Sequence, residues 1–97
     1  MPTYVILMNL TEQGIKNIKT APERIEMTSK ALEAAGGKLI GVYSTMGQYD
    51  SVAIAEGPSD EAAMTQLLTI GMAGNVRTTT LKAFTKEEFA VIVKGLP

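Results

Sequence analysis

The sequence contains no cysteine, no histidine and no tryptophan, and aromatic residues make up only 5% of its 97 positions. Without cysteine there is no disulfide, no thiolate nucleophile and no cysteine-ligated zinc or iron–sulfur centre. Without histidine the chain lacks the commonest general base near neutral pH and the imidazole ligands of haem and of most catalytic zinc. Any chemistry must therefore use carboxylates, tyrosines, lysines, arginines, hydroxyls or the backbone, and we expect no metal and no cofactor.

An excess of positive charge is also missing, because the formal net charge is -1 and the isoelectric point is near 5.3. Recognition of a phosphate backbone normally needs clustered lysine and arginine, so nucleic acid is an unfavourable partner. No long hydrophobic run occurs either. The first apolar run, Tyr4–Leu10, has no basic flank and is far shorter than the roughly 20 residues that span a bilayer. We expect a soluble cytoplasmic protein that does not associate with membranes.

The composition is that of an ordinary folded protein, with 45% hydrophobic and 20% charged residues. A chain of 97 residues has no room for a second hydrophobic core. We therefore predict one domain that spans residues 1–97.

Hydrophobic periodicity and capping residues divide the chain into alternating strands and helices. A Thr-x-x-Glu capping box at Thr20 and Glu23 restarts a helix after a short turn that begins at Thr11. A second capping box begins a final helix at Thr85, which runs toward Gly95. The predicted strands are residues 4–8, 38–46, 51–56 and 76–82, and the two long helices end at Gly36-Gly37 and before Gly74.

This order, β-α-β-β-α-β-α, predicts an α+β ferredoxin-like fold with an extra C-terminal helix, in which both crossover helices cover one face of the sheet. The first strand, residues 4–8, places Val5 and Leu7 on one face and Ile6 and Met8 on the other. The face without helices is thus too apolar to remain in water. We predict that two copies pair sheet to sheet in a dimeric α+β barrel.

Three segments carry a family resemblance. The most distinctive is Met46-Gly47-Gln48-Tyr49-Asp50, between the second and third strands. With Thr11-Glu12-Gln13-Gly14, Lys19 and Arg24 before it and Gly74-Asn75-Val76-Arg77-Thr78 after it, the chain resembles the GYD family of small prokaryotic proteins along its full length. The resemblance implies the ferredoxin-like fold and a dimeric barrel, and it implies almost nothing about function.

The Tyr49-Asp50 pair is the first candidate for a functional site. Turn chemistry alone explains part of the motif, because Gly47 can adopt the positive φ of a tight hairpin and Asp50 can accept bonds from backbone amides. The functional alternative places Tyr49 and Asp50 at the mouth of a pocket, where a partly desolvated carboxylate acts as a base.

Arginines supply the candidate anion contacts. Arg77 can hold a ligand carboxylate or phosphate, or pair with Asp50. Arg24 and Lys19 lie near Pro22, where free helix amides can bind an anion, although surface solvation explains them as well.

Polar side chains on otherwise apolar strands, such as Tyr4, should find partners or line a cavity. We expect Asp50 and Arg77 to reach one cavity, with Tyr43 or Tyr49 on its wall. The predicted ligand-binding residues are Tyr43, Tyr49, Asp50, Arg77, Asn9 and Arg24.

Three functions remain open on this basis, and the sequence leaves open whether the protein is an enzyme. The first is a homodimer that binds a small organic molecule beside the sheet. The second is a cofactor-free isomerase or monooxygenase, with Asp50 as the base and Tyr43 or Tyr49 as the hydrogen-bond donor. The third is an interaction module in which the dimer, or a ring of dimers, is the functional product.

Overall fold

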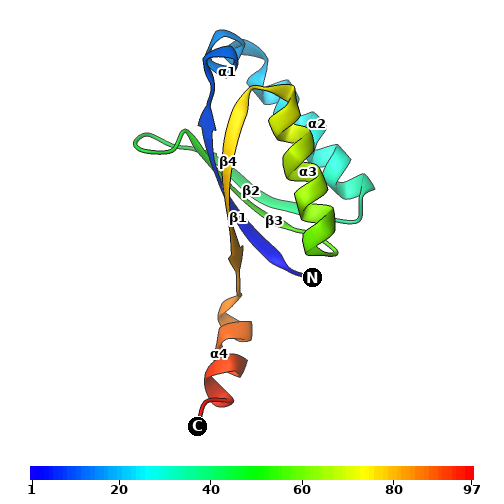
Figure 1. Cartoon of the computed structure of the whole chain (residues 1–97), viewed down its shortest axis with the longest axis vertical. Coiled ribbons are helices and arrows are strands. Elements are labelled where there is room, and N and C mark those ends of the chain that lie inside the picture. Colours follow the sequence, from blue (N-terminus) through cyan, green and yellow to red (C-terminus); the bar gives the residue numbers. More distant parts are fainter.

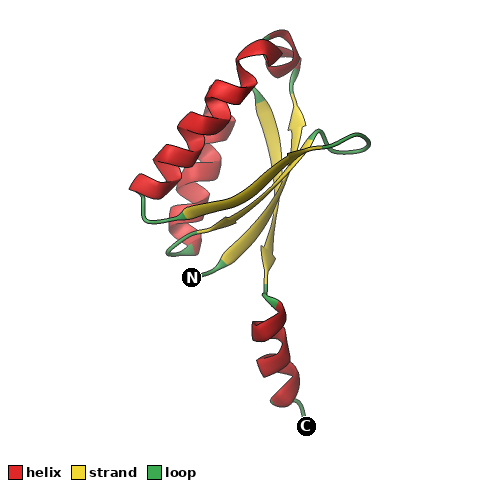
Figure 2. Ribbon diagram, turned by 180° about the vertical axis from the view of Figure 1, so that it is seen from behind, coloured by secondary structure: helices red, strands yellow, loops and turns green.

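The computed structural model describes residues 1–97 as one four-stranded antiparallel sheet with helices α2 and α3 on one of its faces (Figures 1 and 2). The strands are β1 (Thr3–Leu10), β2 (Lys38–Ser44), β3 (Ser51–Glu56) and β4 (Val76–Ala83). The helices are α1 (Glu12–Lys16), the 3₁₀ turn η1 (Ile18–Thr20), α2 (Ala21–Ala34), α3 (Asp60–Ala73) and α4 (Lys86–Lys94).

The spatial strand order is β2-β3-β1-β4, so β1 and β3 are central and β4 is an edge strand. Two β-α-β crossovers on one face of such a sheet make the ferredoxin-like α+β fold that the element order predicts. The C-terminal helix α4 is present as well, so the predicted fold class is confirmed for the single chain.

Most helix boundaries follow from local side chains. Ser59 caps α3 by accepting a hydrogen bond from the amide of Ala62, and Thr85 forms the predicted capping box with Glu88. Gly74 ends α3 with a φ of 85°, a left-handed conformation that glycine adopts without strain.

Two predicted details are wrong. Thr20 forms no capping box, because its hydroxyl donates to the carbonyl of Asn17, just before η1, and accepts from no backbone amide of α2. The 3₁₀ turn therefore runs directly into α2, and Pro22 lies in the first turn of that helix. Strand β2 ends at Ser44, two residues earlier than predicted, because the chain leaves the sheet for the loop that contains Gly47.

The strand register decides which face each side chain occupies. Even-numbered residues of β1, among them Ile6 and Met8, point toward α2 and α3. By strand alternation the odd-numbered residues Val5 and Leu7 lie on the face without helices, which we call the open face. The paired strands add Val52 and Ile54 of β3, Tyr43 of β2 and Leu81 of β4 to the open face.

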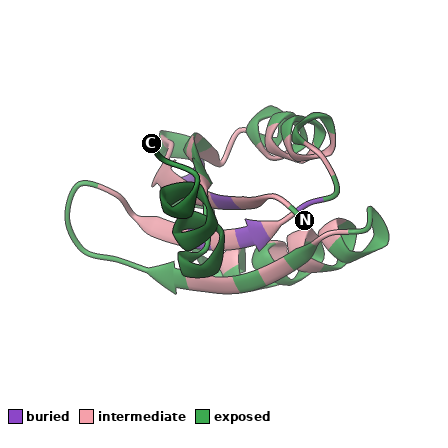
Figure 3. Ribbon diagram, turned by 90° about the horizontal axis from the view of Figure 1, so that it is seen from below, coloured by how far each residue is buried: buried purple, intermediate pink, exposed green.

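Burial within one chain is sparse. Only 5 of 97 residues are buried, and none of them lies in α2, α3 or α4 (Figure 3). The accessible surface is 6878 Å², whereas a globular monomer of this mass exposes about 5,400 Å². The radius of gyration is 14.7 Å, against about 12.5 Å for a compact chain of this length. The chain thus exposes roughly 1,500 Å² more surface than a typical monomer.

Helix α4 accounts for part of this extension. It continues beyond the end of β4 and projects away from the rest of the chain (Figures 1 and 2).

None of the helices combines the length and the apolar character that crossing a bilayer requires.

Candidate functional site: a cavity between the sheet and the helices

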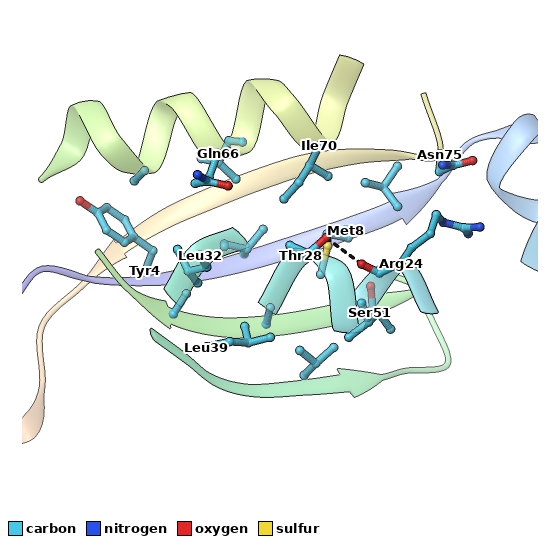
Figure 4. A pocket seen from close by; sticks show the side chains of 18 of the residues that line it. Tyr4, Met8, Arg24, Thr28, Leu32, Leu39, Ser51, Gln66, Ile70 and Asn75 are labelled. Carbon is cyan, nitrogen blue, oxygen red and sulfur yellow. Dashed lines mark hydrogen bonds between the residues drawn. The ribbon is translucent and has the colours of Figure 1, made fainter. Parts of the chain in front are cut away.

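A cavity of about 410 Å³ lies between the sheet and helices α2 and α3 (Figure 4). Of its 30 lining residues, 19 are hydrophobic. The floor consists of the even-numbered β1 side chains together with Ala53 and Ala55 of β3, and the walls include Leu32 of α2 and Ile70 of α3. The small alanine side chains leave space that larger residues would fill, so the sequence of β3 itself helps to create the cavity.

Polar side chains gather at one end of the cavity. Arg24 from the first turns of α2 and Asn75 from the turn before β4 lie at that end, and Tyr4 lies at the other (Figure 4). Asp50 and Ser51, at the start of β3, also line the cavity. A ligand in this site would meet apolar walls along most of its length and charged or polar groups at one end.

Arg24 is the positive group of the polar end. One guanidinium nitrogen, Nη1, donates to the carbonyl of Asn17 at 3.0 Å and to the hydroxyl of Thr20. The two ion pairs of the structure, Lys16–Glu12 and Lys82–Asp60, do not involve Arg24. Its charge is therefore not neutralised by a protein carboxylate, and its remaining N–H groups are free to bind an anion.

Asp50 is the negative group of the polar end, and it also has a structural role, because it bonds to backbone groups of β1. Its Oδ2 accepts a hydrogen bond from the amide of Leu10 at 2.8 Å, and its own amide donates to the carbonyl of Met8 at 2.9 Å. Its carbonyl accepts from the amide of Thr45 at 2.9 Å. These bonds fasten the β2–β3 loop to the end of β1, and Gly47 allows the loop its reversal with a φ of 128°.

A second polar cluster, which the sequence did not predict, lies beside the opposite end of the cavity, and Tyr4 is its only member that lines the cavity. The hydroxyl of buried Tyr4 donates to Oδ1 of Asp60 at 2.5 Å, and Nζ of Lys82 donates to Oδ2 of the same carboxylate at 3.0 Å. The hydrogen bond to Asp60, with desolvation and the negative charge nearby, raises the pKa of Tyr4 to about 12. The same bond, followed by that from Lys82, lowers the pKa of Asp60. The acidic start of α3 was the only sequence signal for this partner.

The predicted site residues divide between the two faces of the sheet. Arg24 and Asp50 line the cavity. Arg77 and Asn9 are paired in register and, by strand alternation from Leu10, lie on the open face. The expectation that Asp50 and Arg77 share one cavity is thus corrected. The pairing of Arg77 with Asn9, which the sequence could not supply, places Arg77 on the sheet face that the helices do not cover.

The two candidate tyrosines do not line the cavity. Tyr43 lies on the open face with its ring over Gly41, where a Cβ atom would come within 3.2 Å of the ring carbon Cε2. Tyr49 is half-buried in the β2–β3 loop, and its carbonyl accepts a hydrogen bond from the hydroxyl of Thr45 at 2.5 Å. A role for Tyr43, Tyr49, Asn9 or Arg77 in ligand binding stays a prediction.

The three sequence segments that carry the family resemblance meet at the polar end. The amide of Thr11 donates to the carbonyl of Asn75 at 3.0 Å, and the hydroxyl of Thr11 donates to the carbonyl of Gly74 at 2.5 Å. Gly14 touches the same turn so closely that a Cβ atom would lie 2.0 Å from the Asn75 carbonyl oxygen. Asp50 joins them through the amide of Leu10. The motifs therefore build the end of the cavity where its charged groups lie.

The fold and this cavity define a class: small ferredoxin-like α+β proteins with an apolar space between sheet and helices and one polar end. Within that class the chain belongs to the GYD domain family, whose sequence model matches residues 4–93.

Three known proteins are similar to this chain. A Thermus thermophilus protein described as a glutamine synthetase and cystathionine beta-lyase binding protein is 32% identical over 84 residues, which cover 86% of this chain and 88% of that protein. The crystal structure of FFRP-DM1 has a TM-score of 0.58 at 22% identity and covers 87% of this chain and all of that one. The crystal structure of TTHA0845, also from Thermus thermophilus, has a TM-score of 0.51 at 26% identity, over 88% of this chain and 95% of that one. The likeness to FFRP-DM1 supports the fold alone.

Proposed function

We propose that this protein is a homodimer that binds a small organic molecule in the cavity between sheet and helices. The observation that carries the proposal is the cavity itself. Its volume of about 410 Å³ lies within the roughly 300–1,000 Å³ range of small-ligand sites, and most of its lining residues are hydrophobic, as such sites require.

The lining indicates the chemistry of the ligand. Leu32, Ile70 and the alanines of β3 can bury an apolar body, while Arg24 offers unpaired N–H donors to an anionic group. Asp50 and Asn75 lie at the same end and can accept from a hydroxyl or amino group. We infer a molecule with an apolar body and one carboxylate or similar anionic end.

The homodimer rests on the open face. Leu7 and Val5 of β1 and Ile54 of β3 lie there without a covering helix, and α4 extends past the sheet and does not fold back over it (Figure 2). Two copies related by a two-fold axis can cover each other's open face and remove much of the excess surface. The cavity lies on the other side of each sheet and stays accessible in such a dimer.

A fluorescence titration tests the ligand proposal. The probe is 8-anilinonaphthalene-1-sulfonate, which has an apolar aromatic body and one anionic group. We expect one probe per chain, Arg24→Gln to weaken binding at least tenfold, and Ala53→Phe to abolish it by filling the floor of the cavity. Lys19→Gln, a nearby surface charge that does not line the cavity, is the matched control and should leave the affinity unchanged.

The titration also has outcomes that count against the proposal. Equal weakening by Arg24→Gln and Lys19→Gln would indicate only general attraction to positive charge. Binding that survives Ala53→Phe would place the probe on an exposed apolar surface and would remove the cavity as the site. A broad thermal-shift screen of carboxylate-bearing metabolites that moves no melting temperature would contradict a natural small-molecule ligand.

Binding of an enzyme is a second candidate function, and helix α3 favours it. This helix is apolar on both sides: Leu67 and Ile70 face the cavity, whereas Met64, Leu68 and Met72 form a ridge at four-residue spacing on the outer side. The ridge side chains are 56%, 60% and 86% exposed. A sheet-to-sheet dimer would leave them exposed, so they suit a further protein, as the description of the Thermus thermophilus relative would lead one to expect.

Sedimentation with purified glutamine synthetase and cystathionine beta-lyase from the same organism tests this second function. We expect co-sedimentation with at least one enzyme, its loss in Leu68→Asp, and its retention in Thr69→Asp, where the same charge sits beside the ridge on an exposed helix position. No co-sedimentation of the native protein with either enzyme would contradict binding to these partners.

A further inference from the structure

Helix α4 carries an apolar stripe that is exposed along its whole length. Every residue from Phe84 to Pro97 is exposed. Phe89, Ile92 and Val93 of α4, and Leu96 in the turn just after it, recur at the i, i+3, i+4, i+7 spacing that places side chains on one side of a helix. The helix projects beyond the sheet, away from α2 and α3 (Figures 1 and 2).

The local sequence of α4 favours a helix, but it is too short to keep the helix stable without packing against another surface. Thr85 accepts from the amide of Glu88 at 3.1 Å, and the Glu88 carboxylate accepts from the amide of Thr85 at 2.7 Å. This reciprocal cap satisfies two N-terminal amides. Isolated helices shorter than about 12–15 residues are nevertheless marginal in water, and α4 has 9 residues. Its stripe needs packing that the rest of the chain does not supply.

The amount of excess exposed surface favours a second copy of this chain as the partner that covers the α4 stripe. The excess of roughly 1,500 Å² over a typical monomer exceeds the ~800 Å² per partner that a standard interface buries. The stripe is also continuous along the chain with the open face, because Leu81 lies on that face and exposed Phe84 links it to α4. The surface that needs covering therefore runs from the sheet onto the helix.

We propose that α4 is an exchanged arm: in the dimer, each copy packs the Phe89–Leu96 stripe of its α4 against the other copy. The proposal rests on the homodimer proposed above and adds to it that the sheet faces alone do not complete the interface. The opposite side of α4, with Glu87 and Val91, faces water in this arrangement.

Two aspartate variants test the arm with identical chemistry. Val93 lies in the stripe, whereas Val91 is 71% exposed on the opposite side of the helix. In sedimentation experiments across a dilution series, we expect Val93→Asp to weaken the dimer at least tenfold and Val91→Asp to change its dissociation constant less than twofold. Equal effects of the two substitutions, or none from Val93→Asp, would overturn the proposal.

A spin-label experiment shows where α4 goes, even if Val93→Asp only unfolds the helix. Because the chain has no cysteine, Val91→Cys, on the side of α4 that faces water in the proposed dimer, carries a single nitroxide label. When labelled unenriched chains are mixed with ¹⁵N-enriched unlabelled chains, we expect broadening of amide signals in the enriched copy. A dimer without such broadening would refute the exchanged arm while leaving the sheet-to-sheet dimer intact, and a native protein that is monomeric by light scattering would refute both.

Discussion

At the scale of single residues, close approach explains why glycine occupies position 14. Its missing side chain lets α1 lie directly on the turn that joins α3 to β4, against the carbonyl of Asn75. The backbone on the other side of this contact is itself held by Thr11 and cannot move away without breaking those bonds. The tolerance for a methyl group at Gly14 is therefore small.

We expect Gly14→Ala to lower the free energy of unfolding by about 2 kcal/mol or more, because overpacking against backbone costs about 1–3 kcal/mol. Urea unfolding followed by circular dichroism measures the change. Gly71→Ala is the control: Gly71 lies inside α3 with open space around its Cβ position, and alanine there should stabilise by up to about 1 kcal/mol. Stabilisation by both substitutions would contradict the close contact.

The Tyr4–Asp60 hydrogen bond makes stability depend on pH at both extremes. The pKa of Tyr4 is raised from 10.0 to about 12, so the contribution of the protonated phenol is present below pH 10 and is lost as the pH rises through 12. The pKa of Asp60 is lowered from 3.8, so the contribution of its ionised form is present above that value and is lost as the pH falls further.

Urea unfolding of native and variant chains at pH 3, 7 and 11 tests this bond. We expect Tyr4→Phe to flatten the loss of stability above pH 10, and Asp60→Asn to flatten the loss below pH 4. The amide and hydroxyl of Thr85 lower the pKa of Glu88 from its ordinary value of 4.5, so the contribution of ionised Glu88 is also lost as the pH falls below that value. Some acid dependence should therefore remain in Asp60→Asn. Native-like profiles in both variants would show that the bond is not maintained in solution.

At the scale of secondary-structure elements, the cavity arises because β3 presents alanines where β1 and α2 present larger side chains. Ala53 is only 4% exposed, yet it lines the cavity beside Ile6 of the neighbouring strand. If a cavity lies above Ala53, a larger side chain at this position has room, whereas in a close-packed core it would clash with its neighbours. A single substitution of Ala53 can therefore distinguish the two cases.

We expect Ala53→Leu to leave the free energy of unfolding unchanged or to raise it, because the new methyl groups enter the cavity. In a close-packed core the same substitution would cost about 1–3 kcal/mol. Thermal and urea unfolding of the native protein and Ala53→Leu give the answer. A loss in the latter range would mean that the helices close onto the sheet in solution and that no ligand cavity exists.

At the scale of the whole molecule, unsatisfied apolar surface is the dominant feature. The open face, the α3 ridge and the α4 stripe lie on three different parts of a chain that buries only 5 of its residues. A domain of this size is marginal without additional burial, so the dimer proposed above would add to its stability.

We expect the native protein to scatter light as a particle of twice 10.3 kDa, and Leu7→Asp to split or unfold it, because an unpaired charge buried between two sheets costs several kcal/mol. Met27→Asp, on an exposed position of α2 that is 70% accessible, is the control and should leave the dimer intact. A monomeric native protein at micromolar concentration would show that the open face is covered in another way.

The sequence by itself determined the features that depend on neighbouring residues. Strand and helix order, the Ser59 and Thr85 caps, the glycine that ends α3 and the apolar character of both faces of β1 all follow from local patterns. The sequence motifs alone also indicated the family, whose model matches residues 4–93. These are properties of segments a few residues long, for which spacing and side-chain type are sufficient.

Only the tertiary structure decided what depends on register and on contacts between distant segments. It placed Leu7 on the open face and Met8 under the helices, and it separated Arg77 from Asp50. Asp50 bonds a backbone amide 40 positions away, and Tyr4 reaches Asp60 across 56. A shift of one residue in strand pairing reverses every side chain, and no local pattern reports such a shift, so the composition of the cavity's polar end could emerge only once the strands were paired.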